Sequence, residues 1–265
     1  MPDSSLSSAD SALVDRLVDA YSTHSQIGPD DWHVPADLQR AHRIQDAFAA
    51  RLGRRRIGWK AAATNAPAQA RRGVAEPLYG QLFADALFEQ PIEIDAARFI
   101  DPHLEIEFAF RFGRAPVAAQ PRFDAAEIAD AIDSLALAVE LVDSRCAEWR
   151  NCDAASLVAD NLAHGATLLG PSFTDWRSLP RTDVVTTLHV DGQQIAAGSG
   201  AEVLGDPLQA VVWLADRLRS DGRAIEAGQW VLSGTTCPVV RLSRGATQMT
   251  AEFSGLGRLV AEFRW

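Results

Sequence analysis

The stretch His103-Leu104-Glu105-Ile106-Glu107-Phe108-Ala109-Phe110 alternates polar or small residues with large apolar residues, a pattern typical of a β-strand with one apolar face. On such a strand, Glu105 and Glu107 point to the same side, with their Cα atoms roughly 7 Å apart. Both carboxylates can then reach one cation. An exposed sheet face is the alternative interpretation, but glutamate is depleted in strands and adjacent like charges repel. The pattern therefore favours a shared ligand.

Around this strand, the chain divides into a helical beginning and a longer strand-rich part. Apolar residues at helical spacing predict helices at about 10–24, 37–52, 124–133 and 207–220. Turn residues bound predicted strands at 57–62, 104–113, 134–145, 165–170, 183–190, 229–233, 238–242, 247–253 and 257–263. Because helices come first and strands dominate later, we predict an α+β fold. We expect a single domain, 1–265, with a helical part at about 8–55 and a β-rich part at about 56–265.

A second strand-like segment carries one isolated acid. In Leu135-Ala136-Leu137-Ala138-Val139-Glu140-Leu141-Val142, only Glu140 interrupts the apolar run. A buried, unpaired glutamate would cost several kcal/mol, so Glu140 must be protonated, paired or bound to a metal. Arg145 is the structural alternative as its partner. Three glutamates on two strands would form an all-oxygen site that suits Mg²⁺ or Mn²⁺ and leaves positions open for substrate oxygens.

Lys60 is the only lysine of the chain, and the other 24 basic residues are arginines. Arginine is a permanently charged planar fork, whereas lysine is a compact donor whose pKa changes with burial. Chance survival of one lysine on a solvated face is the alternative. The acids downstream make a functional lysine the favoured interpretation.

Composition excludes several classes of function. The formal net charge of −10 disfavours nucleic acids and anionic membranes as partners. The chain has no signal-peptide pattern, no apolar run of the ~20 residues that a membrane span needs, and no nucleotide-binding motif. Cys146, Cys152 and Cys237 lack the spacing of a zinc site. These features predict a reduced, cytoplasmic setting.

Several short motifs follow one another in a recognisable order. They are Gly58-Trp59-Lys60, Gly73-Val74-Ala75-Glu76-Pro77-Leu78-Tyr79-Gly80, Glu105-Ile106-Glu107, Glu140-Leu141-Val142-Asp143-Ser144-Arg145, Val158-Ala159-Asp160-Asn161, Val231-Leu232-Ser233-Gly234-Thr235-Thr236 and Ala251-Glu252-Phe253-Ser254-Gly255-Leu256-Gly257. No single motif is specific, but the order resembles the 2-keto-4-pentenoate hydratase and 4-oxalocrotonate decarboxylase branch of the fumarylacetoacetate hydrolase family. The resemblance runs from about residue 10 to the end.

The resemblance implies a mixed β-roll of the family's C-terminal-domain type and a divalent metal, Mg²⁺ or Mn²⁺, at its mouth. It implies that Glu105, Glu107 and Glu140 hold this metal. The metal would bind the oxygens of a 2-oxo acid and stabilise its enolate. Lys60 would act as charge stabiliser or proton donor, with its pKa depressed towards neutrality by the metal and by burial.

The resemblance also implies further site residues. Asp160 and Asn161, together with Ser233 and Thr235, would supply hydrogen bonds to the substrate carboxylate and to water. Tyr79 would contact the substrate. For Asn161 and Thr235, ordinary turn hydrogen bonding is an equally good interpretation.

One departure from the family pattern concerns the base. Many hydratases of this branch have an acid directly after the proline of the Pro-x-Tyr/Phe-Gly motif, and here that position is Leu78. Either Glu76 takes over as base, or the reaction or substrate differs. His164 stands where a small residue is expected, as a packing histidine or as a replacement base.

The resemblance implies a metal-dependent hydratase that converts a 2-hydroxy-2,4-dienoate to a 4-hydroxy-2-oxo acid in the catabolism of aromatic compounds. A decarboxylase of the 4-oxalocrotonate type, an acylpyruvate hydrolase and a non-catalytic partner subunit remain alternatives. The expected partners are a small 2-oxo or 2-hydroxydienoic acid and further copies of the chain, or a homologous decarboxylase or hydratase; nucleic acid and membrane are not expected.

Overall fold

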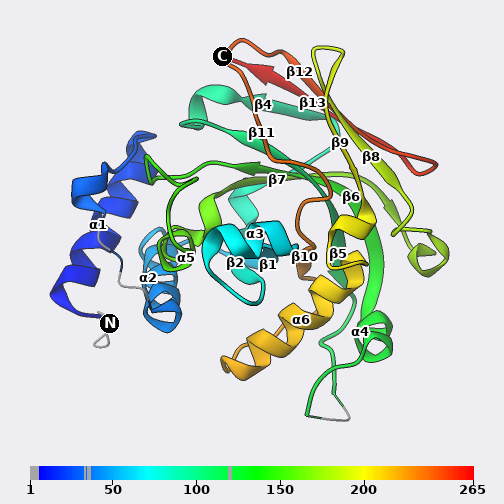
Figure 1. The fold of residues 1–265 in the computed structure, drawn as a ribbon, viewed down its shortest axis with the longest axis horizontal. Coiled ribbons are helices and arrows are strands. Elements are labelled where there is room, and N and C mark those ends of the chain that lie inside the picture. Colours follow the sequence, from blue (N-terminus) through cyan, green and yellow to red (C-terminus); the bar gives the residue numbers. More distant parts are fainter. Residues whose placement is uncertain (1–5, 33, 35–36, 119–120) are drawn as a thin grey trace.

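The computed structural model describes the chain except for residues 1–5, 33, 35–36 and 119–120 (Figure 1). The α-helices are α1 (Ser8–Thr23), α2 (Leu38–Arg51), α3 (Ala66–Arg72), α4 (Ala125–Ala131), α5 (Ala154–Ala159) and α6 (Pro207–Ser220). The strands are β1 (Arg56–Ala62), β2 (Leu78–Phe83), β3 (Leu87–Glu89), β4 (Ile92–Asp95), β5 (His103–Phe112), β6 (Ile132–Val142), β7 (His164–Phe173), β8 (Val185–Val190), β9 (Gln193–Ser199), β10 (Trp230–Leu232), β11 (Val240–Arg241), β12 (Gln248–Phe253) and β13 (Gly257–Arg264). Helices precede a strand-rich part, as the sequence predicts.

The strands form two mixed sheets that pack against each other. The larger sheet has the order β2-β1-β10-β5-β6-β7-β3, with β11 also paired to β5. The smaller sheet has the order β4-β13-β12-β8-β9. Figure 1 shows the smaller sheet lying across one side of the larger, and α6 with α4 on another side. This arrangement confirms the predicted α+β fold.

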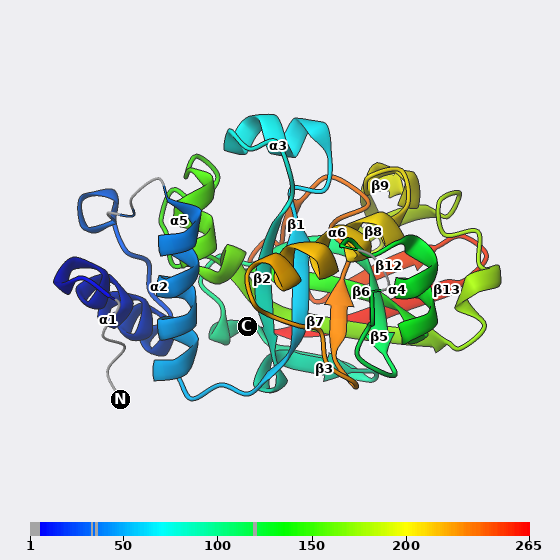
Figure 2. The same cartoon turned by 90° about the horizontal axis from the view of Figure 1, so that it is seen from below.

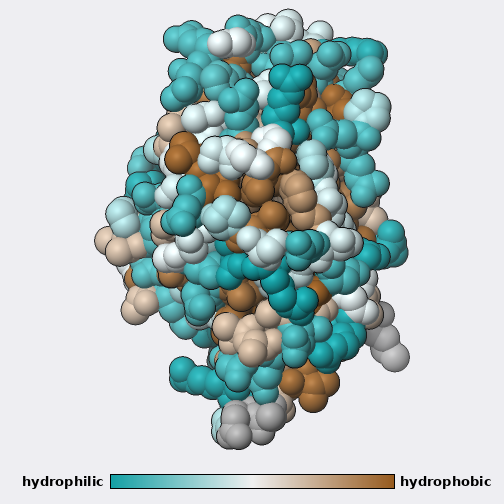
Figure 3. Space-filling model, turned by 90° about the vertical axis from the view of Figure 1, so that its right-hand side faces the viewer, coloured by the Kyte–Doolittle hydropathy of each residue, from teal (hydrophilic) through white to brown (hydrophobic). Residues whose placement is uncertain are grey.

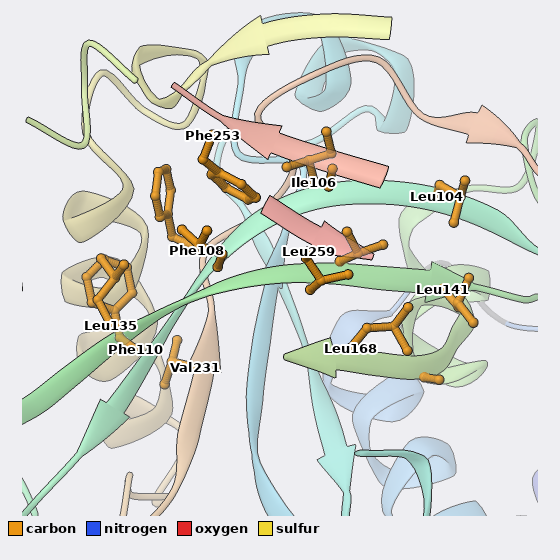
Figure 4. Close-up of a cluster of buried hydrophobic side chains, with 14 of the residues drawn as sticks. Leu104, Ile106, Phe108, Phe110, Leu135, Leu141, Leu168, Val231, Phe253 and Leu259 are labelled. Atoms are coloured by element: carbon orange, nitrogen blue, oxygen red, sulfur yellow. The ribbon is translucent and has the colours of Figure 1, made fainter. Parts of the chain in front are cut away.

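The main core lies between the two sheets. Leu104, Ile106 and Phe108 of β5 point into it, where Phe253 and Leu259 of the smaller sheet meet them (Figure 4). The intervening residues of β5 therefore point to the other side of the larger sheet. Apolar packing on one face of β5 thus fixes the direction of the two glutamates on the other.

The N-terminal helices form a second core with α5. The Ser7 side chain and Asp10 form a capping box at the start of α1, and Asp37 caps α2. Leu17 and Ile44 lie in the cluster of buried apolar residues that these helices share with α5. Figure 2 shows α1, α2 and α5 side by side at one end of the molecule. The predicted helical part therefore covers one end of the β-rich part.

The structure adds elements that the sequence does not predict. The prediction of only two helices after residue 56 is wrong because α3 and α5 also form, with seven and six residues. All residues of β2 are buried, so it lacks the alternation that reveals a strand. The strand predicted at 134–145 already ends at Val142. Beyond it, the Asp143 side chain turns to accept hydrogen bonds from the amides of Ile100 and Asp101.

The surface and the helices bear on the predicted partners. Figure 3 shows apolar residues among hydrophilic ones on the side that lies to the right in Figure 1. No helix in the described part of the chain is long and apolar enough to cross a membrane. Assembly into oligomers stays a prediction.

Candidate active site

The three predicted metal ligands meet on the face of the larger sheet that points away from the smaller sheet. Glu105 and Glu140 are direct partners in the register of β5 and β6, and Glu107 follows two residues along β5. One ligand atom from each of the three residues lies within 4.8 Å of the others. The side chains of Glu107 and Glu140 are fully buried. The strand pairing alone therefore gathers three carboxylates at one point.

Lys60 reaches this cluster from β1. Its Nζ donates hydrogen bonds to Glu140 Oε1 at 2.6 Å and to the Leu162 carbonyl oxygen at 3.1 Å. Strands β10 and β5 separate β1 from β6 in the sheet order, so this contact requires a strongly curled sheet. Glu140 thus pairs with Lys60, and the interpretation that Arg145 is its partner is wrong.

Some polar atoms of the cluster have hydrogen-bond partners, and others do not. Glu140 Oε1 lies 2.9 Å from His164 Nδ1, and the amide of Gly234 donates to Glu107 Oε2 at 2.8 Å. Among the described residues, Glu107 Oε1, Glu140 Oε2 and His164 Nε2 are buried without a hydrogen-bond partner. Buried carboxylate oxygens seldom lack a partner. A hard divalent cation would satisfy both of them, so the donor set fits Mg²⁺ or Mn²⁺.

Electrostatics show that one ammonium does not balance three carboxylates. Burial, reinforced by the charge of Glu140, raises the pKa of Glu105 to about 7 and that of Glu107 well above its usual range. Burial opposes the charges of Lys60 and Glu140. Their mutual attraction outweighs it, so the Lys60 pKa is raised and the Glu140 pKa is lowered. Burial is therefore not enough to depress the pKa of Lys60, and the expected effect of a bound metal on this pKa stays a prediction.

A pocket of about 130 Å³ opens above this cluster. Lys60 and Glu105 contribute polar groups to its lining. The rest of the lining is Ala62, Ala63, Thr64, Asn65, Ala68, Arg71, Arg72, Leu78, Val142, Trp149, Arg150, Leu157, Leu162, Gly234, Thr235 and Val239. The pocket therefore joins Glu105 and the sole lysine to a wall that is largely apolar, with arginines among its residues.

Residues 53–264 match the family model described as fumarylacetoacetate (FAA) hydrolase C-terminal. The chain belongs to the fumarylacetoacetate hydrolase family. It is 33% identical to 2-keto-4-pentenoate hydratase of Paraburkholderia xenovorans, over 91% of this chain and 86% of that protein. It is 30% identical to a 4-oxalocrotonate decarboxylase of Pseudomonas sp, over 84% of each chain. The resemblance to this branch of the family is confirmed.

Solved structures of the fumarylacetoacetate hydrolase family agree with the fold. The 4-oxalocrotonate decarboxylase of Pseudomonas putida G7, complexed with magnesium and adipate, superimposes with a TM-score of 0.88 at 26% identity, over 99% of this chain and 100% of that chain. A fumarylpyruvate hydrolase of Pseudomonas aeruginosa, in complex with Mn²⁺ and pyruvate, gives 0.59 at 16% identity, over 79% and 89%. Divalent metals thus accompany the fold in both neighbours, and the second likeness concerns the fold alone.

Glu76, which the sequence suggests as a catalytic base, does not line the pocket. Its carboxylate accepts hydrogen bonds from Arg217 Nη1 at 2.9 Å and Trp213 Nε1 at 3.2 Å, and the side chain is half exposed. Its placement therefore does not support the prediction that Glu76 acts as the base, because the ion pair holds it elsewhere. His164 is buried beside Glu140. Leu78 forms part of the pocket wall.

Asp160 and Asn161 make structural contacts. Asp160 accepts hydrogen bonds from Ser144 Oγ at 2.7 Å and Arg145 Nε at 2.5 Å. The side-chain oxygen and nitrogen of Asn161 pair with the backbone of Gln81 on β2, at 2.8 and 2.9 Å. Neither residue lines the pocket. The predicted hydrogen bonds to substrate would require these side chains to leave their present partners. For Asn161, the present partner is the remote strand β2 and not its own turn, so the contact is structural but differs from the turn interpretation.

Of the other three predicted substrate contacts, Tyr79, Ser233 and Thr235, only Thr235 lines the pocket. Tyr79 donates to Asp221 at 2.7 Å, and burial raises the pKa of its hydroxyl. The hydroxyl of Ser233 is buried and donates to the Gly234 carbonyl. Neither lines the pocket, whereas Thr235 does, with its hydroxyl bonded to the Cys237 carbonyl. Thr235 alone of these predicted contacts stands beside the space for a substrate.

The sequence prediction missed the arginines of the pocket. Arg71 and Arg72 end helix α3, and Arg150 follows Trp149 in the turn after β6. The adjacent pair Arg71-Arg72 stands directly before the Gly73-Val74 motif, so its position was visible in the sequence. The sequence does not reveal that this pair lies beside the pocket, because helix α3, which places it there, is not predicted.

Proposed function

We propose that this chain is a divalent-metal-dependent hydratase that adds water to a 2-hydroxy-2,4-dienoate and forms a 4-hydroxy-2-oxo acid. The observation that carries the proposal is the cluster of three glutamates, two of them fully buried, beside the only lysine and next to a pocket. Relatives of similar length bear the name 2-keto-4-pentenoate hydratase. We further propose a cytoplasmic homo-oligomer acting in aromatic catabolism.

Glu105, Glu107 and Glu140 would hold Mg²⁺ or Mn²⁺, and the bound ion would act as a Lewis acid towards the oxygens of a 2-oxo acid. In the absence of a metal, the Glu140 carboxylate, 2.6 Å from Nζ, raises the pKa of Lys60 and so favours its protonated form. Its ammonium faces the pocket and would donate a hydrogen bond to an oxygen on which negative charge develops. The Leu162 carbonyl fixes the direction of that donor.

The pocket walls would control water. Leu78, Leu157 and Leu162 line one part of the wall, whereas Thr64 and Thr235 bring hydroxyl groups. An apolar wall excludes bulk water and strengthens the electrostatic interactions inside. The hydroxyls would hold the single water molecule that adds to the substrate. Gly234 is needed beside them, because a Cβ there would lie 2.2 Å from Thr64 Oγ1.

A decarboxylase of the 4-oxalocrotonate type is the second candidate, and Leu78 favours it. Loss of CO₂ from a 2-oxo-3-enedioate needs the same stabilised enolate but no base to activate water. An apolar side chain at the position where many hydratases carry an acid suits that simpler requirement. The remaining machinery of the pocket would serve both reactions.

Turnover of a small substrate panel tests the proposal. The purified chain is assayed with 2-hydroxypentadienoate, 4-oxalocrotonate and an acylpyruvate, in Mg²⁺, in Mn²⁺ and in EDTA. Metal-dependent formation of a 4-hydroxy-2-oxo acid supports the hydratase, whereas CO₂ release from 4-oxalocrotonate supports the decarboxylase. Cleavage of the acylpyruvate would show a hydrolase. Absence of both turnover and metal binding would favour a non-catalytic subunit and overturn the proposal.

A further inference from the structure

Three arginines gather where the pocket opens to the surface. Lys60 is buried at the inner end, whereas Arg71 and Arg150 are exposed. Both arginines also line an adjoining cavity, together with Asn65, Thr235 and other residues of the first pocket. The two cavities therefore share the part of the wall where these arginines stand. A ligand that extends outward from the lysine would meet them.

Within the described part of the chain, no carboxylate lies within ion-pair distance of Arg71, Arg72 or Arg150. Glu202 lines the adjoining cavity but forms no such pair. In a chain of net charge −10, Arg71 and Arg150 are cations without an ion-pair partner, and the charge of Glu105 acts on Arg72 without forming an ion pair. Burial, and then the charge of Arg71 with a contribution from Arg150, lowers the pKa of Arg72. The cations thus repel one another, and a bound anion would relieve that repulsion.

The three arginines differ in what they can offer. Arg72 donates from Nη1 to the carbonyls of Trp149, Arg150 and Cys152, at 3.1, 2.9 and 2.8 Å. It therefore holds the turn that carries Arg150. The Arg150 guanidinium lies over the Trp149 ring, 5.3 Å from its centroid. Its donors and those of Arg71 have no protein acceptor among the described residues, which leaves two guanidinium forks for a ligand.

We propose that Arg71 and Arg150 form a second anion subsite, which selects 2-oxo acids that carry a carboxylate at the far end of the chain. The inference rests on the proposed function, because the inner end of the ligand must be held at Lys60 and the glutamates. The substrate class is then a dicarboxylic 2-oxo acid or its enol. A substrate with an apolar end would leave the two guanidinium groups without a partner.

Two 2-oxo acids with the same number of carbon atoms show the effect of the far carboxylate on binding. 2-Oxoadipate carries this carboxylate, whereas 2-oxohexanoate ends in a methyl group. Binding of each to the full chain is measured by calorimetry in excess Mg²⁺. We expect 2-oxoadipate to bind at least about tenfold more tightly, which corresponds to about 1.4 kcal/mol. Arg71→Gln and Arg150→Gln should each reduce that preference, and the double variant should abolish it. Affinity for 2-oxohexanoate should not change.

Controls separate this role from a structural one. Arginines in the last turn of a helix also stabilise it through the helix dipole, so the unfolding temperature of each variant is measured. Arg244→Gln, an exposed arginine outside the pocket lining, should leave both affinities unchanged. Because the subsite is exposed, the preference should also shrink in high salt.

The possible failures have distinct meanings. If both ligands bind equally well to the unaltered chain, the subsite is refuted while the 2-oxo acid site stands. If the preference exists but survives in the stable double variant, other residues hold the far carboxylate and the assignment is refuted. If neither ligand binds although Mg²⁺ does, the proposed function and the subsite both fail.

Discussion

The chain contains two clusters in which acidic and basic side chains meet, one around Asp160 and Arg145 and one around Glu140 and Lys60. The two clusters differ in how many of their polar atoms have a hydrogen-bond partner. Asp160 receives hydrogen bonds from Ser144 and from the backbone and side chain of Arg145, whose other donors reach carbonyl oxygens. The cluster around Lys60 instead has three carboxylates for one ammonium, and two of the carboxylate oxygens have no partner among the residues that the structure describes.

This difference separates a structural cluster from a functional one. A fully bonded buried ion pair fixes the positions of its neighbours and offers nothing to a ligand. Unmatched carboxylates cost stability unless a cation binds them. The first cluster is complete within the chain, whereas the second becomes complete only with a metal.

The largest expected effect comes from breaking the complete cluster. Asp160→Asn would leave the Arg145 guanidinium buried without a counter-charge, and we expect a loss of about 3–5 kcal/mol in the free energy of unfolding. Urea denaturation measures it. Affinity for Mn²⁺ should stay unchanged in the folded variant. A stability loss below about 1 kcal/mol would show that this pair is not the structural cluster.

Glu107→Gln should have the opposite effect: it should change the free energy of unfolding little and weaken metal binding strongly. Burial raises the pKa of Glu107 well above its usual range and so favours the neutral form, which a glutamine resembles. We therefore expect unfolding free energy within about 1 kcal/mol of the unaltered chain. Affinity for Mn²⁺, measured by calorimetry, should fall by more than about a hundredfold, above the effect of residues that only support ligands.

Glu140→Gln serves as a contrast to this variant. It removes a ligand as well, but it also deprives Lys60 of its ion-pair partner. Stability and metal affinity should therefore fall together. Unchanged metal affinity in both variants would refute the metal site.

Lys60→Arg tests the lysine. A guanidinium is larger and planar, and it cannot replace a point donor in a fully buried position. We expect turnover to fall about a hundredfold, the scale of a lost proton donor or charge stabiliser. The exposed substitution Arg244→Lys is the matched control and should leave the rate unchanged. Full activity of the Lys60 variant would return this residue to a packing role.

The smallest effect concerns pH. Because the pKa of Glu105 is raised to about 7, a metal must displace its proton at lower pH. Affinity should rise with pH, by about fivefold between pH 6 and pH 7 from this group alone. Calorimetry in buffers of different ionisation enthalpy measures the released protons. No proton release near pH 6 would contradict the raised pKa.

Much of the fold could be predicted because its strongest patterns are local. The alternation through Glu105 and Glu107 fixed their common direction, and the apolar run around Glu140 marked it as unusual. Strands β5 and β6 then pair as the patterns require. By contrast, β2 is buried on both faces and α3 is short, so neither carries a readable period.

The site was less predictable because its contacts depend on how the sheet curls. Nothing local distinguishes Lys60 from Arg145 as the partner of Glu140; only the closing of β1 towards β6 does. The same holds for Asp160, which pairs with Arg145 from the C-terminal end of α5. The sequence motif singled out Asp160 and Asn161 as site residues. The structure gives both a scaffolding contact, and their contacts with a substrate stay a prediction.

Because Lys60 is buried, its chemical modification can report local unfolding of the larger sheet. The only side-chain amine lies on a strand of the larger sheet, 1% exposed, so an amine-directed reagent too large for the pocket can modify it only when that part of the molecule unfolds. The modification rate then measures how often the native structure opens, as hydrogen exchange does for amides. Since a metal on the adjacent carboxylates would suppress such openings, ligand occupancy could be followed by protein mass alone.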